Sequence, residues 1–152
     1  MRLSKTALLL LTVPVAIWAA DPFLGTWKAN VSKSHYTAGS PPKEQTVVIG
    51  DSGDTQDTTV TVTAADGTSV SYRFTTPSKG GPGAVVESAG FDGVTAKRIN
   101  ENTRQTQYTM AGKVVGTVQS TVSSDGRSMR AIVKGTDADG QPINATVVYE
   151  QK

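Results

Sequence analysis

The sequence contains no cysteine, which excludes disulfide bonds, thiol catalysis and zinc sites built on cysteine. It contains a single histidine, His35, so a serine–histidine–acid triad or a histidine metal site would have to pass through this residue. No convergent partners accompany His35 in the sequence, and we interpret it as a surface residue. We therefore predict a protein that is not an enzyme and that needs no metal or cofactor.

An excess of charge of one sign is also lacking. The chain has 15 lysines and arginines against 13 aspartates and glutamates, and two of the basic residues, Arg2 and Lys5, lie at the extreme N-terminus. The remainder is therefore close to neutral. Binding to nucleic acid or to an anionic membrane surface requires a basic stripe or cluster, so neither partner is predicted. We expect a monomer.

Long apolar runs are missing after residue 20. Before it, Arg2 and Lys5 precede an apolar stretch over residues 7–17, and Ala19 and Ala20 follow. This layout is typical of a cleaved secretory signal, with cleavage after Ala19 or Ala20, although an uncleaved N-terminal anchor is the alternative. We expect residues 1–20 to be the signal peptide and residues 21–152 to form one exported domain, periplasmic or extracellular in a bacterium.

Turn signals recur along this domain, and Asp-Gly is the most frequent of them. Glycine accepts the positive φ that a tight turn between twisted strands requires. The spacing of the turns predicts ten strands, near residues 24–30, 44–50, 57–64, 68–75, 84–89, 93–99, 103–110, 113–123, 127–134 and 141–150. Two segments break this rhythm, and we interpret residues 31–43, with Pro41 and Pro42, as a loop and residues 80–83 as a mobile connection.

Between the turns, apolar and polar residues alternate. Val60 and Val62 share one face of residues 58–64, and residues 103–110 place Arg104, Thr106, Tyr108 and Met110 on one face. A period of two is typical of antiparallel strands with two different faces. Short connections between so many strands favour an up-and-down meander closed into a barrel of 8–10 strands, because closure removes the exposed edges. A Greek-key sandwich remains the alternative.

Both ends of this domain resemble a known superfamily. The segment "FLGTWK", from Phe23 to Lys28, resembles the first-strand motif of the calycins, which include lipocalins and fatty-acid-binding proteins. "VKG" at residues 133–135 and "VVYE" at residues 147–150 are similar to the last two strands of the fatty-acid-binding proteins. The resemblance implies a bacterial secreted lipocalin-like barrel, in which Gly25 and Trp27 form a structural plug at the closed end.

The departures from this pattern concern the ligand. An inward arginine precedes the final tyrosine by two residues in fatty-acid-binding proteins, and Val147 stands in that position here. A second arginine of the same clamp would fall near Val122. No two-helix lid is expected between the first two strands. The resemblance therefore implies the fold but not a fatty-acid carboxylate anchor.

The interior of the barrel is the remaining place for a function. Small residues such as Gly116, Ser120, Ala131 and Ala145 would leave volume there if they face inward, and barrels of this size either fill with side chains or hold one small ligand. The predicted ligand-binding residues are Tyr72, Phe74, Arg104, Tyr108, Met110, Val118, Arg130 and Tyr149. Arg104, followed by Arg130, is the candidate for a buried cation that meets an anionic group.

Two functions stay open at this point. The first is a binding module that holds a small apolar or amphiphilic molecule. The second is a structural or interaction protein with a filled barrel, whose outer face or loops contact another macromolecule. A hydrophobic fluorescent probe would distinguish them.

Overall fold

The computed structural model describes residues 19–137 and 139–152. The predicted signal peptide falls on residues 1–20, of which residues 1–18 lie outside the described part. The elements are β1 (Gly25–Ala29), a 3₁₀ turn η1 (Val31–Lys33), β2 (His35–Ala38), β3 (Glu44–Asp51), β4 (Thr55–Thr63), β5 (Ser69–Pro77), β6 (Gly81–Pro82), β7 (Ala84–Glu87), β8 (Gly93–Asn100), β9 (Thr103–Met110), β10 (Lys113–Val122), β11 (Ser128–Thr136) and β12 (Pro142–Gln151).

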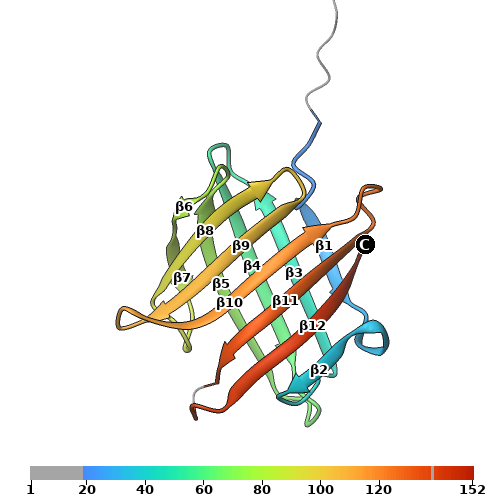
Figure 1. Cartoon of the computed structure of the whole chain (residues 1–152), viewed down its shortest axis with the longest axis vertical. Helices are drawn as coiled ribbons and strands as arrows, with labels where there is room; N and C mark the ends of the chain where they lie inside the picture. The colour runs from blue at the N-terminus through green and yellow to red at the C-terminus, as the bar shows by residue number, and fades with distance from the viewer. Residues whose placement is uncertain (1–18, 138) are drawn as a thin grey trace, which may run out of the picture.

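These strands form one antiparallel sheet in the order β6-β8-β9-β10-β11-β12-β1-β3-β4-β5-β7, and β2 pairs with β12 outside this path. The last strand meets the first, since Trp27 lies opposite Gln151 and Ala29 lies opposite Tyr149. The sheet curls into a nearly closed barrel (Figure 1). The predicted all-β meander barrel is confirmed, with the ten expected strands and two additional short ones.

The barrel closes on its other side through the chain itself, because β6 and β7 lie at the two ends of the sheet path and are consecutive in sequence. Gly81 and Pro82 pair with β8, Gly83 N–H donates to Val94 O at 2.9 Å, and β7 then pairs with β5. A Cβ on Gly83 would lie 2.0 Å from Thr75 O, so this crossing needs glycine. The interpretation of residues 80–83 as a mobile connection is therefore wrong, because the segment is paired into the wall.

Residues 31–43 also hold more structure than the predicted loop. The side chain of Asn30 caps η1 by accepting from Lys33 N–H, and β2 then pairs with β12 at Asn144–Thr146. The two prolines come after β2, so they do not interrupt its ladder. His35 lies on β2 and is exposed.

One irregularity shifts the face of a strand. β10 carries a bulge between Val114 and Gly116, so that Val115 turns inward and Val114 is 54% exposed. Strict alternation along residues 114–122 would place Val114 on the same face as Val118. Because the bulge adds one residue to β10, the side chains that precede it in this strand point to the opposite face from the one that strict alternation predicts.

The largest part of the core lies behind the β1–β12 junction. Trp27 and Phe23 are fully buried there, and Val147 and Tyr149 from β12 pack in the same cluster. The indole N–H of Trp27 donates to Phe23 O at 2.8 Å, which satisfies its one polar group. A second, smaller cluster of Phe74, Phe91 and Val94 lies on the opposite wall.

Candidate ligand cavity inside the barrel

A cavity of about 100 Å³ lies inside the barrel. Residues of β3, β4, β5 and β9 to β12 contribute to its wall, and the alternation along each strand turns every second side chain toward it. Six of the eight ligand-binding residues expected from the sequence line this cavity: Tyr72, Phe74, Arg104, Tyr108, Val118 and Tyr149. The structure thus brings together residues that are spread over 78 positions of sequence.

The other two expected residues lie elsewhere. Arg130 is exposed on the outer face of β11, because its neighbours Met129 and Ala131 are buried and adjacent side chains point to opposite faces. Met110 is half-buried at the last position of β9, beside the turn at Ala111, and does not line the cavity. Both are corrections to the predicted set.

Polar side chains outside the predicted ligand-binding set also face the interior. Thr58, Thr106 and Ser120 are buried and line the cavity, and Gln56 is buried beside it. Thr58 lies on the same face of β4 as Val60 and Val62, so strict alternation along the strand predicts that it points inward. A search for apolar residues alone passes over it because threonine resembles the outward residues of the same strand.

Arg104 is the charged group of this interior. Its guanidinium lies 4.5 Å from the centre of the Phe23 ring, and one of its terminal nitrogens donates to Gln56 Oε1 at 3.0 Å. Within the described residues, Arg104 forms no salt bridge and its Nε is buried without a hydrogen-bond partner. Burial lowers the pKa of Arg104 to about 10, so the side chain stays charged at neutral pH.

A buried cation without an anion is costly, because the loss of hydration is not offset by an opposite charge. The contact with Phe23 recovers part of this cost, as an arginine over an aromatic face is worth about 0.5–2 kcal/mol. The part of the desolvation cost that this contact does not recover favours the binding of an anionic group beside Arg104. The hydroxyl of Thr58, also buried and without a partner among the described residues, adds a polar atom to the same cavity wall.

Three tyrosines complete the polar lining. Tyr149 accepts a hydrogen bond from Gln45 Nε2 at 2.8 Å. Burial raises the pKa of Tyr72 to about 12, and it raises the pKa of Tyr108 and of Tyr149 as well. These phenols therefore stay protonated at neutral pH and can donate hydrogen bonds. The lining supplies several donors and one positive charge.

Aromatic rings form the wall of the cavity away from the plug. The rings of Tyr72, Phe74 and Tyr108 line it, and Phe91 packs behind them with ring centres 5.4, 6.1 and 4.7 Å away, respectively. In the sequence, Phe91 stands directly before Asp92-Gly93, a dipeptide typical of turns. Its burial depends on where the segment between β7 and β8 folds back, which no local pattern reveals.

Side chains of β8 and of the segment before β1 meet around Phe23, beside Trp27. Asp21 accepts from the guanidinium of Arg98 at 2.8 Å and from Phe23 N–H at 3.0 Å. Arg98 also lies 5.0 Å from the centre of the Phe23 ring. Gly25 has φ +126°, a conformation that favours glycine, at the first position of β1, the strand that carries Trp27. Gly25 thus begins β1, and Trp27 is fully buried two residues later.

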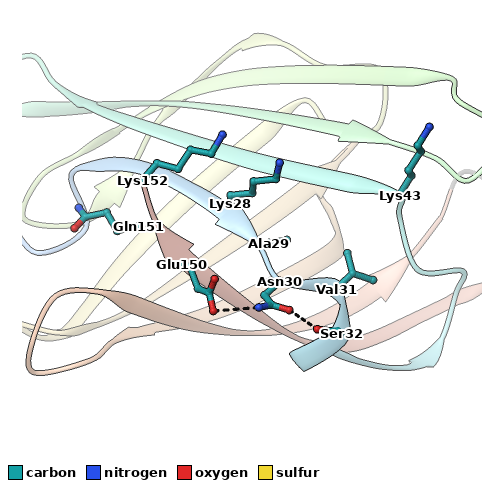
Figure 2. A pocket seen from close by; sticks show the side chains of 9 residues that line it. All are labelled: Lys28, Ala29, Asn30, Val31, Ser32, Lys43, Glu150, Gln151 and Lys152. Carbon is teal, nitrogen blue, oxygen red and sulfur yellow. Dashed lines mark hydrogen bonds between the residues drawn. The ribbon is translucent and has the colours of Figure 1, made fainter.

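A second hollow, a groove of about 500 Å³, lies on the outer surface beside β1, η1 and the end of β12. Figure 2 shows the side chains of Lys28, Lys43 and Lys152 extending in the same direction along it. Lys28 pairs with Glu44 at 2.9 Å, and the hydrogen bond from Lys28 is the main cause that lowers the pKa of Glu44. Within the described chain, Lys43 and Lys152 have no ion-pair partner.

In residues 19–137 and 139–152, no three histidine, aspartate or glutamate side chains come together in a way that could hold a metal ion. The helical part of the same residues contains nothing of the length and hydropathy that a membrane-spanning helix requires.

Among the solved structures that are similar to this chain, two have a TM-score of 0.42 each. One is a redesigned β-barrel, mFAP1, bound to DFHBI, with 16% sequence identity over 86% of this chain and 95% of that chain. The other is the siderocalin Ex-FABP, described as acting through dual ligand specificities, with 11% identity over 86% of this chain and 74% of that chain. No protein-family model and no curated protein matches the sequence. The strand pairing, rather than these two likenesses, establishes the barrel.

Proposed function

We propose that this protein binds a small amphiphilic molecule inside its barrel, with an anionic group of the ligand held at Arg104. The observation that supports this most strongly is the buried guanidinium in the cavity wall, with a free Nε and no carboxylate partner among the described residues. An anion there would receive charge-assisted hydrogen bonds, which are stronger than neutral ones. The rings of Tyr72 and Phe74 would contact the apolar part of the ligand.

The remaining parts of the proposal concern lineage and location. We propose a lipocalin-like member of the calycin superfamily that is exported from a bacterium by residues 1–20. Support for the lineage comes from the Gly-x-Trp motif, with Trp27 buried at the β1–β12 junction. Support for export comes from the sequence of residues 1–20. Export is tested by the N-terminal residue of the protein recovered from the periplasm or medium of its host, which should be Ala20 or Asp21.

Binding is tested with a pair of probes that differ in one charged group. Anilinonaphthalene sulfonate carries an anionic sulfonate, and N-phenylnaphthylamine lacks it. Titration of the purified protein should give saturable one-to-one binding of the anionic probe. Arg104→Met should weaken binding of the sulfonate about tenfold to a hundredfold, because a hydrogen bond to a charged group contributes about 1.5–3 kcal/mol, and should leave the neutral probe nearly unaffected.

Two cavity variants show whether the probe binds inside. Val118→Trp should fill the cavity and abolish binding of both probes, and Tyr108→Ala should weaken both. Unchanged binding in Val118→Trp would place the probe outside the barrel. If Arg104→Met weakened the binding of both probes equally, or weakened the binding of neither, the role proposed for Arg104 would be contradicted.

The outer groove supports a second candidate function, an interaction protein that uses its outer face. Lys28, Lys43 and Lys152 line this groove and exceed its acidic residues in number. Absence of probe binding, together with binding of an acidic partner that is lost when Lys43 and Lys152 are replaced by glutamine, would favour this alternative.

A further inference from the structure

The interior cavity is smaller than the pockets in which proteins usually bind small organic molecules. It measures about 100 Å³, whereas pockets for small organic molecules are about 300–1,000 Å³. An apolar cavity of about 150 Å³ holds a molecule of the size of benzene. An amphiphilic ligand can therefore be accommodated only if part of the wall moves.

Most of the cavity wall is held in place by backbone ladders. Tyr72, Phe74 and Tyr108 lie on β5 and β9, which pair with a neighbouring strand on each side. Phe91 differs from them because it belongs to the segment 88–92, which connects β7 to β8 and is not part of a strand. Its ring is nevertheless 9% exposed, packed against the three rings that line the cavity.

The segment that carries Phe91 is hydrogen-bonded to its surroundings at Asp92, whereas the bonds to Ser88 lie within the segment. Ser88 Oγ accepts from the N–H groups of Gly90 and Phe91 at 3.1 and 3.3 Å. Asp92 N–H donates to Thr109 O at 2.9 Å, and the Asp92 carboxylate accepts from Ala111 N–H at 3.0 Å. A Cβ built on Gly90 would meet no atom within 4 Å, so the outer side of the segment faces open space.

The barrel wall is interrupted beside this segment. β7 pairs with β5, and β6 pairs with β8, but within the described residues no ladder joins β7 to β8. Phe91 covers the interior at this interruption. An outward movement of its ring would break side-chain packing but no strand pairing.

We infer that Phe91 determines the size of ligand that the cavity accepts, and that an aromatic ring of the ligand replaces the Phe91 ring against Tyr72, Phe74 and Tyr108. This inference rests on the proposed function. Phe91 meets Tyr72 and Phe74 edge to face, with interplanar angles of 87° and 75°, and a ligand ring could make the same contacts. With Arg104 at the other side of the cavity, the ligand class is an aromatic acid.

Fluorine NMR tests this displacement directly. The chain has three phenylalanines, Phe23, Phe74 and Phe91, so incorporation of 4-fluorophenylalanine gives three resonances that single Phe→Leu variants assign. Saturation with anilinonaphthalene sulfonate should expose Phe91, seen as line broadening by a soluble paramagnetic agent. The Phe23 resonance, in the plug, should stay protected.

Kinetics of probe association supply the second readout. Association is slowed when binding requires a conformational change, so Phe91→Ala should accelerate it roughly tenfold. Val85→Ala is the matched control, because Val85 packs in the same cluster but lies on the paired strand β7, and it should leave the rate unchanged. Phe91→Leu provides a milder replacement if the alanine variant does not fold.

The outcomes separate this inference from the proposed function. Saturable binding with Phe91 still protected and no acceleration in Phe91→Ala or Phe91→Leu would overturn the displacement of Phe91. Binding to Phe91→Ala alone would also overturn it, because the native ring would then be a fixed wall. No binding to any of these proteins would overturn the proposed function itself.

Discussion

The barrel wall closes at two places. At one, β1 pairs with β12, and at the other the chain crosses from β6, which pairs with β8, to β7, which pairs with β5. At the first junction, three residue pairs form a regular ladder. The side chains of Trp27 and Tyr149 pack behind this ladder in the core. At the second, two residues of β6 pair with β8 before the chain crosses at Gly83. The first junction combines backbone pairing with the largest buried side chains, and the second depends on a close approach of backbone at one glycine.

We expect the first junction to stabilise the barrel and the side of the second junction to give a ligand access to the interior. The β1–β12 junction contains the plug and most of the core, so it is expected to open only when the whole protein unfolds. The β7–β8 side carries a buried aromatic residue on an unpaired segment, so it is expected to open locally at lower cost. Substitutions at the two junctions should therefore differ in their effects on stability and on local opening.

Trp27→Ala should remove the plug behind the first junction. A large-to-small substitution of a buried tryptophan costs about 3–5 kcal/mol, compared with a total stability of about 5–15 kcal/mol for a domain. Chemical unfolding of the variant should show this loss. An unchanged unfolding midpoint would show that Trp27 does not stabilise the junction.

Alkaline pH should destabilise the barrel through its buried tyrosines. The folded-state pKa of Tyr72, about 12, exceeds its ordinary value of 10, so its stabilising contribution is present below pH 10 and is lost as the pH rises toward 12. This amounts to about 3 kcal/mol for Tyr72 alone, and the raised pKa values of Tyr108 and Tyr149 act in the same direction. The lowered pKa of Arg104 acts in the opposite direction and offsets part of the loss.

Absorbance at the phenolate wavelength and circular dichroism, recorded together from pH 9 to 12.5, measure this effect. Ionisation of these tyrosines should coincide with unfolding. Phenolate formation near pH 10 in a fully folded protein would contradict their burial.

Gly83→Ala should loosen the second junction. The added Cβ would lie 2.0 Å from Thr75 O and 3.0 Å from Thr76 Cγ2, so the crossing must shift. Overpacking of this kind costs about 1–3 kcal/mol. Hydrogen exchange should speed up for the amides of β6 and β7, while the amides of β1 stay protected.

Gly90→Ala is the control for this variant, because its Cβ would meet no atom within 4 Å. It should leave both stability and exchange unchanged. Faster exchange across the whole barrel in Gly83→Ala would show that the two junctions open together and would contradict the contrast between them.

Glu150→Gln should have the smallest effect. Glu150 accepts from Lys33 Nζ at 2.8 Å and from Asn30 Nδ2 at 3.1 Å on the outside of the first junction. Exposed ion pairs contribute about 0.2–1 kcal/mol, so the unfolding midpoint should change slightly, and less still in high salt. A loss as large as that of Trp27→Ala would mean that the surface, not the plug, holds this junction.

The sequence predicted the features that depend on local patterns. Asp-Gly turns and the period of two place the ten long strands, and the same parity places Tyr72, Arg104 and Tyr108 in the interior. Arg130 was misplaced although the alternation of Met129 and Ala131 argues for an outward position.

The missed features depend on contacts that are distant in sequence. The crossing at Gly83 requires knowledge of where β5 and β8 lie relative to each other, and the burial of Phe91 follows from that crossing. The bulge before Gly116 reverses the face of Val114 without any change in the residue pattern. The position of Gln56 beside Arg104 joins residues 48 positions apart.

The most direct test of this account is a crystal structure of the protein with anilinonaphthalene sulfonate bound. The account predicts the sulfonate within hydrogen-bond distance of the Arg104 guanidinium, the aromatic part of the probe against Tyr72 and Tyr108, and the Phe91 ring moved outward. A probe that lies in the outer groove beside Lys28, Lys43 and Lys152, with the interior unchanged, would contradict it.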